Sequence, residues 1–137
     1  SGVELSSTIK IFDFLRGNYA YTYIKYDKTN DTSATLKRPA HKHSASVTVI
    51  PVSGLDITLS YLYTDDRKDV YYDPVTWSQS IVTLESYHKL DINVRYALND
   101  MATFTFRGEN LTDEDYMDTY GYNTKGRSFY GGLEITL

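Results

Sequence analysis

The sequence of 137 residues contains no cysteine, three prolines and one tryptophan. The lack of cysteine excludes a disulfide scaffold and any site built on thiolates. No apolar stretch approaches the roughly 20 residues that a membrane-spanning helix needs. Positive charge is also scarce, because the formal net charge is −4, which argues against a nucleic-acid partner. What the chain has in excess is tyrosine, with 14 tyrosines against five phenylalanines.

Apolar and polar residues alternate along most of the chain, whereas the spacing of an amphipathic helix is nearly absent. A period of two residues indicates β-strands, so the sequence predicts an all-β protein. We predict seven strands, at residues 3–15, 19–26, 38–51, 56–64, about 82–96, 101–110 and 127–137.

The predicted connections are alternately short and long. Tight turns are expected at residues 16–18, 52–55 and 97–100, and long polar stretches occupy residues 27–37, 65–81 and 111–126. In an antiparallel up-and-down meander, this order places every tight turn at one end of the sheet and every long loop at the other. Outer-membrane β-barrels have short periplasmic turns and longer extracellular loops. The pattern therefore favours a segment of a transmembrane β-barrel over a soluble sandwich.

The two faces of the predicted strands differ in chemistry. One face carries large apolar residues such as Leu59, Ile92 and Phe104. The opposite face is polar or charged and comprises Thr58, Ser60, Asp91, Asn93, Arg95, Thr103, Thr105, Arg107 and Glu134. Burying such groups without partners costs several kcal/mol each, and a water-filled or plugged lumen removes that cost. We therefore expect the polar face to line a lumen and the apolar face to meet lipid.

The tyrosines suit the two interfaces of a membrane. We expect Tyr19 and Tyr96 near the short turns, and Tyr26, Tyr63 and Tyr87 near the long loops, to form aromatic girdles. The alternative is that these rings pack across the strands of a soluble sheet.

The stretch ENLTDEDYMDTYGYNTKGRSFYGGLEITL, at residues 109–137, resembles the C-terminal end of TonB-dependent outer-membrane receptors. Two motifs and the last strand carry the likeness, which is tight here and loose over the rest of the chain. The matching positions are Asn110, Leu111, Asp113 and Tyr116, then Gly121, Tyr122, Thr124, Gly126 and Arg127, and finally Phe129, Gly131, Leu133, Ile135 and Leu137. The segment YGYNTKGR is most similar to the vitamin B12 and siderophore receptor branch of that family.

This resemblance implies how the chain is used. The final strand would carry the signal for the barrel-assembly machinery, at Phe129, Leu133, Ile135 and Leu137, although Leu137 departs from the terminal Phe or Trp usual in the family. Receptors of this kind are 22-stranded barrels with a plugged lumen, which seven strands cannot close. We therefore expect residues 1–137 to be the C-terminal portion of such a barrel, without its plug and earlier strands. TonB would act through that missing plug. In isolation, the open strand edges are expected to self-associate.

Catalytic and metal sites are not predicted. No nucleophile elbow or ordered triad can be placed, so we expect no enzyme activity and no cofactor. His41 and His43 share one face of a strand, where an ordinary polar rim is favoured over a metal site. The acidic stretches at residues 65–69 and 113–118 lack the spacing of a calcium loop.

Ligand capture by the long loops remains. Exposed aromatic rings with a few hydrogen-bonding groups suit a bulky metal chelate such as a siderophore, cobalamin or haem. The candidate contact residues are Tyr71, Tyr72, Trp77, Tyr120, Tyr122, Asn123 and Lys125, with Arg67 nearby. The alternative is that these rings belong to the interfacial belt or pack loop against loop.

The predicted function is that of an outer-membrane active transporter that takes up a metal chelate with energy supplied through TonB. One alternative is a small stand-alone outer-membrane barrel of eight strands that acts as an adhesin or structural protein. It needs an eighth strand within residues 70–84. Another alternative is a soluble β-sandwich binding module.

Overall fold

The computed structural model describes residues 1–26 and 36–136. The strands are β1 (Gly2–Phe12), β2 (Leu15–Ile24), β3 (His41–Val52), β4 (Leu55–Thr64), β5 (Arg67–Tyr72), β6 (Gln79–Leu84), β7 (Tyr87–Ala97), β8 (Ala102–Glu109) and β9 (Ser128–Ile135). Within the described part of the chain, no helix is long and apolar enough to span a membrane.

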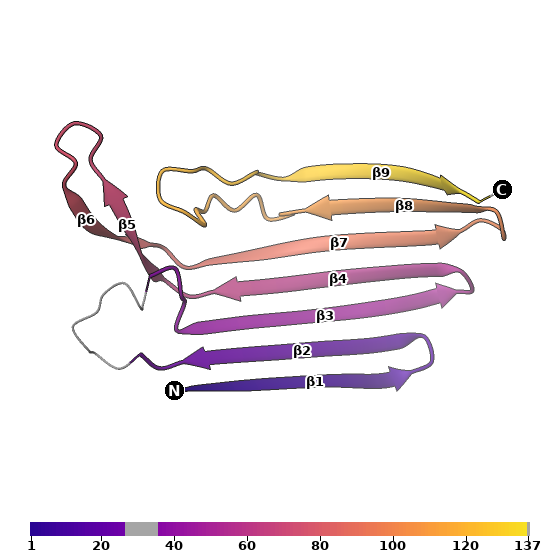
Figure 1. The fold of residues 1–137 in the computed structure, drawn as a ribbon. Coiled ribbons are helices and arrows are strands. Elements are labelled where there is room, and N and C mark those ends of the chain that lie inside the picture. Colours follow the sequence, from indigo (N-terminus) through magenta and orange to yellow (C-terminus); the bar gives the residue numbers. More distant parts are fainter. Residues whose placement is uncertain (27–35, 137) are drawn as a thin grey trace.

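Seven of these strands form one antiparallel sheet in the order β1-β2-β3-β4-β7-β8-β9. Each strand pairs with the next along the chain, apart from the β5–β6 hairpin that is inserted between β4 and β7. The three short turns lie at one end of the sheet, and the β5–β6 hairpin and the connection between β8 and β9 lie at the other, where β2 also ends and β3 begins (Figure 1). The predicted all-β, up-and-down meander with sorted loops is confirmed. The sheet is open, with β1 and β9 at its two edges.

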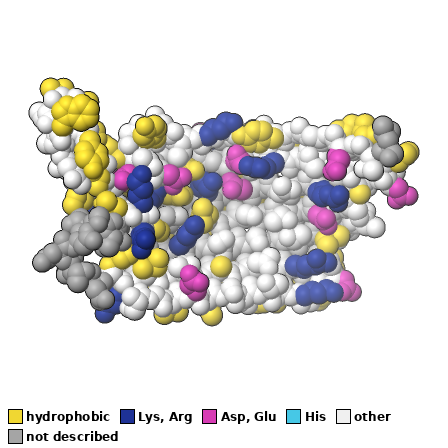
Figure 2. Space-filling view, viewed as in Figure 1, with side chains coloured by type: hydrophobic (Ala, Val, Ile, Leu, Met, Phe, Trp, Pro, Cys, Tyr) yellow, Lys and Arg dark blue, Asp and Glu magenta, His cyan; other side chains and the backbone are white. Residues whose placement is uncertain are grey.

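The strand register keeps the apolar and polar residues on separate faces. Val47 pairs with Leu59, and Leu59 pairs with Ile92, which gives an apolar row across three strands. One residue further along, Ser60 pairs with Asp91 in a polar row. The polar face faces the viewer in Figure 2, where charged side chains of both signs are scattered among uncharged polar ones. The β-strand period of two thus sorts the two faces as the sequence predicted.

The apolar face of the sheet is not covered by any part of the described chain. Val47 keeps 45% of its surface exposed and Leu59 keeps 43%, although both lie in central strands. A soluble sandwich would pack a second sheet onto this face. The second sheet here contains β5 and β6 alone, and it lies beyond the loop end of the first (Figure 1).

The first turn lies earlier than predicted. β1 and β2 are joined at Asp13 and Phe14, while Gly17 and Asn18, the predicted turn residues, lie inside β2. Asn18 accepts a hydrogen bond from Thr8 at 3.0 Å and donates one to Ser46 at 3.3 Å. Its amide is therefore satisfied across three strands, so a turn-forming dipeptide stands in a strand.

The predicted strand at residues 82–96 is in fact two strands. It breaks at Glu85 and Ser86, and the part before the break is β6, which pairs with β5 as a separate hairpin. Residues 70–84 therefore contain strand, but they do not add an eighth strand to the main sheet. The small eight-stranded barrel loses the feature that it required.

Some of the tyrosines predicted to form girdles lie at the expected places in the sheet, and others do not. Tyr63 and Tyr96 lie on the apolar face near the long loops and the short turns, respectively. The prediction is wrong for Tyr87, because this residue pairs with Thr64 on the polar face and is buried. The prediction is also wrong for Tyr19, because the earlier turn places this residue in the middle of β2. Tyr26 instead closes the base of a loop by donating to the carbonyl of Arg38 at 3.0 Å.

A band of tyrosines and histidines crosses the apolar face toward the loop end. The Nδ1 of His43 is hydrogen-bonded to the Tyr19 hydroxyl at 2.9 Å, and the Nδ1 of His41 to the Tyr21 hydroxyl at 2.8 Å. His43 also lies 4.6 Å from the Tyr21 ring, centre to centre. Such amphipathic rings suit the boundary between lipid and water. The two histidines predicted to lie on one strand face do so, each with a tyrosine partner.

Candidate ligand site at the outer loops

Among the residues that the structure describes, the buried side chains gather at the loop end of the sheet. They are Thr64, Arg67, Asp69, Leu84, Tyr87 and Asn110, and four of the six are polar or charged. They belong to the β5–β6 hairpin, to its junctions with β4 and β7, and to the β8–β9 loop at residues 110–127. We call the hairpin, these junctions and this loop the loop cluster.

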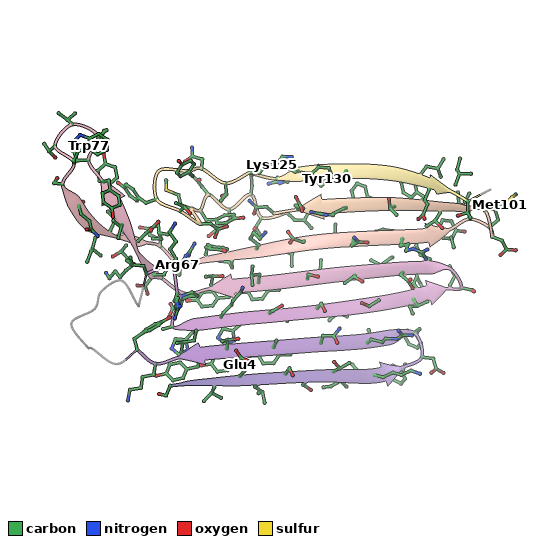
Figure 3. All side chains as sticks on the ribbon, in the orientation of Figure 1. Glu4, Arg67, Trp77, Met101, Lys125 and Tyr130 are labelled. Atoms are coloured by element: carbon green, nitrogen blue, oxygen red, sulfur yellow. The ribbon has the colours of Figure 1, made fainter. Side chains whose placement is uncertain are left out.

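The tip of the β5–β6 hairpin is closed by the Asp73 carboxylate. Its Oδ1 accepts hydrogen bonds from the backbone N–H groups of Val75 and Thr76, both at 2.8 Å. These donors hold the pKa of Asp73 below its usual range. Trp77 follows with a positive φ of 56° and donates its N–H to the Asp73 carbonyl at 2.9 Å. The turn presents Trp77 to solvent at the tip, 80% exposed (Figure 3).

Arg67 ties the hairpin to the β8–β9 loop. Its Nη2 donates to the Asp118 carboxylate at 2.9 Å and to the Met117 carbonyl at 2.7 Å. The guanidinium lies 5.3 Å from the centre of the Tyr87 ring, and the Tyr87 hydroxyl donates to the same Asp118 oxygen at 3.0 Å. The side chain of Arg67 is 4% exposed, whereas that of Asp118 is 62% exposed. The buried cation is thus neutralised by a carboxylate from a segment 51 residues away in sequence.

Asp69 is the second link between the hairpin and the β8–β9 loop. One carboxylate oxygen accepts the N–H of Val70 and the other accepts the N–H of Tyr120, both at 2.8 Å. Lys37, from the connection between β2 and β3, lies 3.8 Å from this carboxylate and donates to Thr119 at 3.3 Å. All three long connections are therefore joined at one place.

Asn110 organises the start of the β8–β9 loop. It is 2% exposed and adopts a positive φ of 50°. Its side-chain amide donates to the Glu114 carbonyl and accepts the Glu114 N–H, both at 2.9 Å. Its own N–H donates to the Asp91 carboxylate at 2.7 Å. One side chain thus satisfies the backbone of a turn that no strand pairing would satisfy.

Asp113 closes the same loop at its other end. Its carboxylate accepts the N–H of Arg127 at 2.8 Å, and a Cβ added at Gly126 would lie 3.1 Å from it. Between these ends, the Thr124 hydroxyl donates to the Tyr116 carbonyl at 2.6 Å. The motif residues that carried the family resemblance therefore hold the loop in shape.

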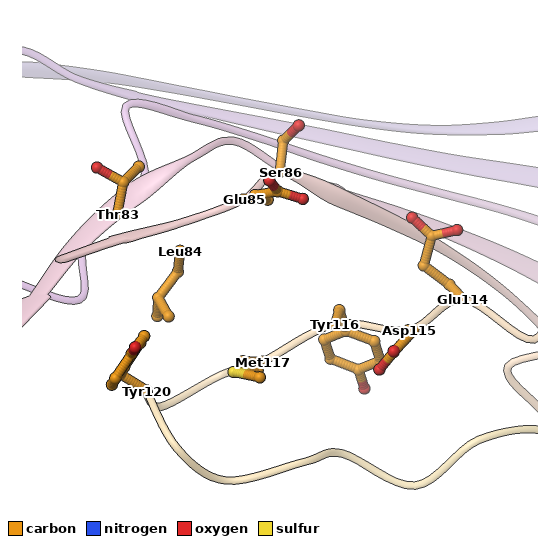
Figure 4. A pocket seen from close by; sticks show the side chains of 9 residues that line it. All are labelled: Thr83, Leu84, Glu85, Ser86, Glu114, Asp115, Tyr116, Met117 and Tyr120. Carbon is orange, nitrogen blue, oxygen red and sulfur yellow. The ribbon is translucent and has the colours of Figure 1, made fainter.

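A pocket of about 360 Å³ lies between the end of the hairpin and the β8–β9 loop (Figure 4). Its walls come from the β6–β7 junction and from the segment that follows Asp113. The lining residues are Thr83, Leu84, Glu85, Ser86, Glu114, Asp115, Tyr116, Met117 and Tyr120. A second hollow of about 280 Å³ is lined by Asp118, Thr119, Tyr122, Asn123 and Thr124.

The predicted contact residues are distributed over several places. Tyr120 lines the larger pocket, and Tyr122 and Asn123 line the second hollow. Tyr71 packs edge-on against Tyr120, with ring centres 5.3 Å apart. Tyr72, like Trp77, is exposed on the hairpin, outside both hollows.

Lys125 points away from both hollows to strand β9 of the main sheet, where its ammonium donates to the Tyr130 hydroxyl at 2.5 Å (Figure 3). The candidate assembly signal lies at the edge strand β9, where Phe129, Leu133 and Ile135 share one face. These three pair with Gly108, Phe104 and Ala102 of β8, and Leu137 lies outside the described residues. Their roles in ligand binding and assembly stay predictions.

The carboxylates and hydroxyls of the larger pocket were not predicted from the sequence. Glu85 and Ser86 stood inside a predicted strand, and the acidic stretch with Glu114 and Asp115 was considered only as a calcium loop, whose spacing it lacks. The break in alternation at Glu85-Ser86, between Leu84 and Tyr87, is the signal that could have located the junction. Among the described residues, no three His, Asp or Glu side chains lie close enough together to hold a metal ion.

Comparison with known proteins agrees with this architecture. A family model described as TonB dependent receptor-like, beta-barrel, matches residues 1–111, where the resemblance drawn from sequence was loose. The vitamin B12 transporter BtuB of Vibrio cholerae serotype O1 is 28% identical over 104 residues, which is 76% of this chain and 17% of the transporter. The chain thus spans less than a fifth of that relative.

Solved structures show the same fold. The siderophore receptor PirA from Acinetobacter baumannii superimposes with a TM-score of 0.77 at 20% identity, over 98% of this chain and 21% of the receptor. The pyoverdine outer membrane receptor FpvA from Pseudomonas aeruginosa PAO1 gives 0.77 at 15% identity, over 99% of this chain and 21% of the receptor. The chain therefore belongs to the TonB-dependent receptor-like β-barrel family and is part of an outer-membrane protein of a Gram-negative bacterium.

Proposed function

We propose that this chain forms the C-terminal wall and outer loops of a receptor that takes up a bulky metal chelate with energy supplied through TonB. The observation that carries the proposal is the pocket at the loop end of a wall that belongs to this family. Its two sides are joined by Arg67 and Asp69. A concave site with aromatic and hydrogen-bonding groups is the kind that binds ligands of this size.

The relatives support the class of substrate. One is a vitamin B12 transporter, and others are receptors for siderophores. Both kinds of ligand are bulky metal chelates, so we propose uptake of such a chelate by the whole protein. The family is one of receptors and transporters, and we propose that this chain carries no catalytic activity.

The polar face of the sheet supports the proposed domain assignment. This face carries Glu4, Arg16, Lys42, Asp56 and Arg95, which need water or polar partners. We propose that residues 1–137 are the last part of a barrel whose earlier strands and plug complete the lumen, and that TonB acts through the plug. Lipid covers the apolar face, and the barrel-assembly machinery recognises β9. Because β1 and β9 are open edges, we expect the isolated chain to self-associate.

The test is chelate uptake by the source bacterium with and without the gene for the whole receptor. Cells are supplied with radiolabelled cobalamin or with ferric siderophores as their source of iron, in strains with and without functional TonB. Uptake that needs both the receptor and TonB supports the proposal. Uptake of every chelate that is unchanged by deletion of the receptor contradicts it.

A further inference from the structure

We propose that the larger pocket selects chelates of zero or positive net charge that present N–H donors, and that it discriminates against anionic chelates. This inference rests on the proposed uptake function. The pocket lies between the β6–β7 junction and the segment of the β8–β9 loop that contains Glu114 and Tyr120 (Figure 4). The inference concerns the charge of the ligand, which the family assignment leaves open.

Both walls of the pocket are fixed before a ligand arrives. Leu84 is 3% exposed and anchors the wall formed by the β6–β7 junction. On the other wall, the Tyr116 ring stacks on the Tyr87 ring with centres 4.1 Å apart. The Met117 carbonyl accepts from Arg67, and the Tyr120 N–H donates to Asp69. A preformed pocket imposes its own charge on the ligand, because little ordering remains to be done on binding.

The charged residues of the pocket lining are all acidic. Glu85, Glu114 and Asp115 bring three carboxylates to the pocket, and no lysine or arginine lines it. Among the described ion pairs, Glu85 and Asp115 have no basic partner within 4.0 Å, and Glu114 has His88 at 3.9 Å. The carboxylates of Glu85 and Asp115 are therefore not compensated by an ion pair.

The cations nearest to the lining are already engaged. Lys68 donates to the Thr83 hydroxyl at 2.6 Å, and the Lys89 ammonium lies 5.8 Å from the centre of the Tyr116 ring and 3.9 Å from Asp91. The Arg67 guanidinium is paired with Asp118. Lys68 and Lys89 thus each contact a lining residue, Thr83 or Tyr116, but neither pairs with a carboxylate of the lining, so the charged groups of the lining itself are all negative.

The chemistry of the ligand follows. Ionised carboxylates accept hydrogen bonds and donate none, so the matching ligand groups are amide or ammonium N–H donors. The tyrosine rings and Met117 offer apolar surface to the body of the ligand. An anionic chelate would meet like charge on two sides, and like-charge juxtaposition is an effective means of rejecting a wrong partner.

The experiment measures equilibrium binding of three probes to the purified, full-length receptor at low ionic strength. The probes are ferrioxamine B, which is cationic, cyanocobalamin, which is neutral and rich in amides, and ferric enterobactin, which is triply anionic. The test variant neutralises the pocket with Glu85→Gln, Glu114→Gln and Asp115→Asn. These changes preserve side-chain size, and the contacts between Glu114 and Asn110 are made by the Glu114 backbone and persist.

The matched control removes three carboxylates that do not line the pocket, through Asp13→Asn, Asp66→Asn and Asp100→Asn. We expect the wild type to bind at least one of the neutral or cationic probes at least about tenfold more tightly than ferric enterobactin. The pocket variant should reduce this ratio by about tenfold, and the control should leave it unchanged. Heat-modifiable migration on gels verifies that each variant is folded.

Two results would overturn the inference: a wild type that binds the triply anionic probe best, or a ratio that is the same in the pocket variant and the wild type. If none of the probes binds, the inference is overturned as well. The uptake test above then decides separately whether the proposed function fails with it, since uptake of some other chelate would keep that function.

Discussion

The seven-stranded sheet, which we call the wall, and the loop cluster are each stabilised in a different way. In the sheet, central apolar residues such as Val47 and Leu59 remain more than 40% exposed, so the described chain does not bury them, and we propose that lipid does. In the loop cluster, Arg67, Asp69 and Asn110 are each at most 5% exposed and are bound by protein groups. The wall is thus specified by a repeating pattern that its surroundings complete, and the loop cluster by individual polar contacts.

The largest effect is expected from a charge on the apolar face of the wall. Leu59→Arg places a cation against the lipid, where it should cost about 2–4 kcal/mol near the bilayer midplane. Ser60→Arg, on the next residue and the opposite face, should cost less than about 1 kcal/mol, because this face is polar. Urea titration of the whole receptor in lipid vesicles measures both. Equal losses for the two variants would contradict the assignment of the faces.

Asn110→Ala should have the next largest effect. It removes the two hydrogen bonds to the Glu114 backbone, leaves those backbone groups without their partner, and puts alanine at a positive φ. A loss of about 2–3 kcal/mol in the stability of the loop cluster is expected. Asn18→Ala is the control in the wall. The Asn18 side chain also makes two hydrogen bonds but is exposed, so about 0.5 kcal/mol is expected.

Limited proteolysis of the whole receptor in detergent compares these two asparagines. The rate of cleavage within residues 111–126 should rise at least tenfold in Asn110→Ala and stay near the wild-type value in Asn18→Ala. If the two variants are cleaved at the same rate, the loop cluster is not held together by Asn110.

A smaller effect is expected from the ion pairs. Asp118→Ala leaves the Arg67 cation, 4% exposed, with the Met117 carbonyl and the Tyr87 ring alone. Because Asp118 itself is 62% exposed, solvent screens the ion pair, and the stability of the loop cluster should fall by about 1–2 kcal/mol. Asp13→Ala, which breaks the exposed pair with Lys10, should cost less than about 0.5 kcal/mol.

Hydrogen exchange of the β5–β6 hairpin, followed by mass spectrometry of the whole receptor, measures the Asp118 effect. Faster exchange of residues 67–84 is expected in Asp118→Ala, and no change there in Asp13→Ala. Unchanged exchange in both variants would mean that the Arg67 link does not hold the hairpin to the β8–β9 loop.

The same contrast explains what the sequence could predict. Alternation of apolar and polar residues, as at Leu59, Ser60 and Tyr61, is local, so it located the main strands, the two faces and the sorting of the loops. The turn at Asp13 and Phe14 was placed too late because Gly17 and Asn18 favour turns locally. The contacts of Asn18 with both neighbouring strands override that preference.

The candidate site was less predictable because its contacts join distant segments. Arg67 meets Asp118, and Asp69 meets Tyr120, each across 51 residues. No periodicity in the sequence records such a pairing. Tyr87 was assigned to a girdle because tyrosines are common at interfaces, whereas the break at Glu85 and Ser86 turns it to the polar face and under Arg67. The exposed rings were predicted as candidates from their residue type, which says nothing of where they point.

The smallest expected effect concerns pH and the hairpin tip, the part of the loop cluster that lacks a buried contact. The pKa of Asp73 is lowered by the N–H groups of Thr76 and Val75. The ionised carboxylate therefore stabilises the turn at pH values above the ordinary pKa of 3.8. This contribution is lost as the pH falls through the lower pKa of the folded state.

In the receptor labelled with 5-fluorotryptophan, the ¹⁹F resonance of Trp77, assigned with Trp77→Phe, should titrate with a midpoint below 3.8. Asp73→Asn keeps an acceptor oxygen and should abolish the titration. Because the β5–β6 hairpin is not part of the main sheet, the sheet should not respond over the same range. A midpoint at or above the ordinary value would show that the turn does not hold the carboxylate. A parallel change in the sheet would show that the tip is not independent of the wall.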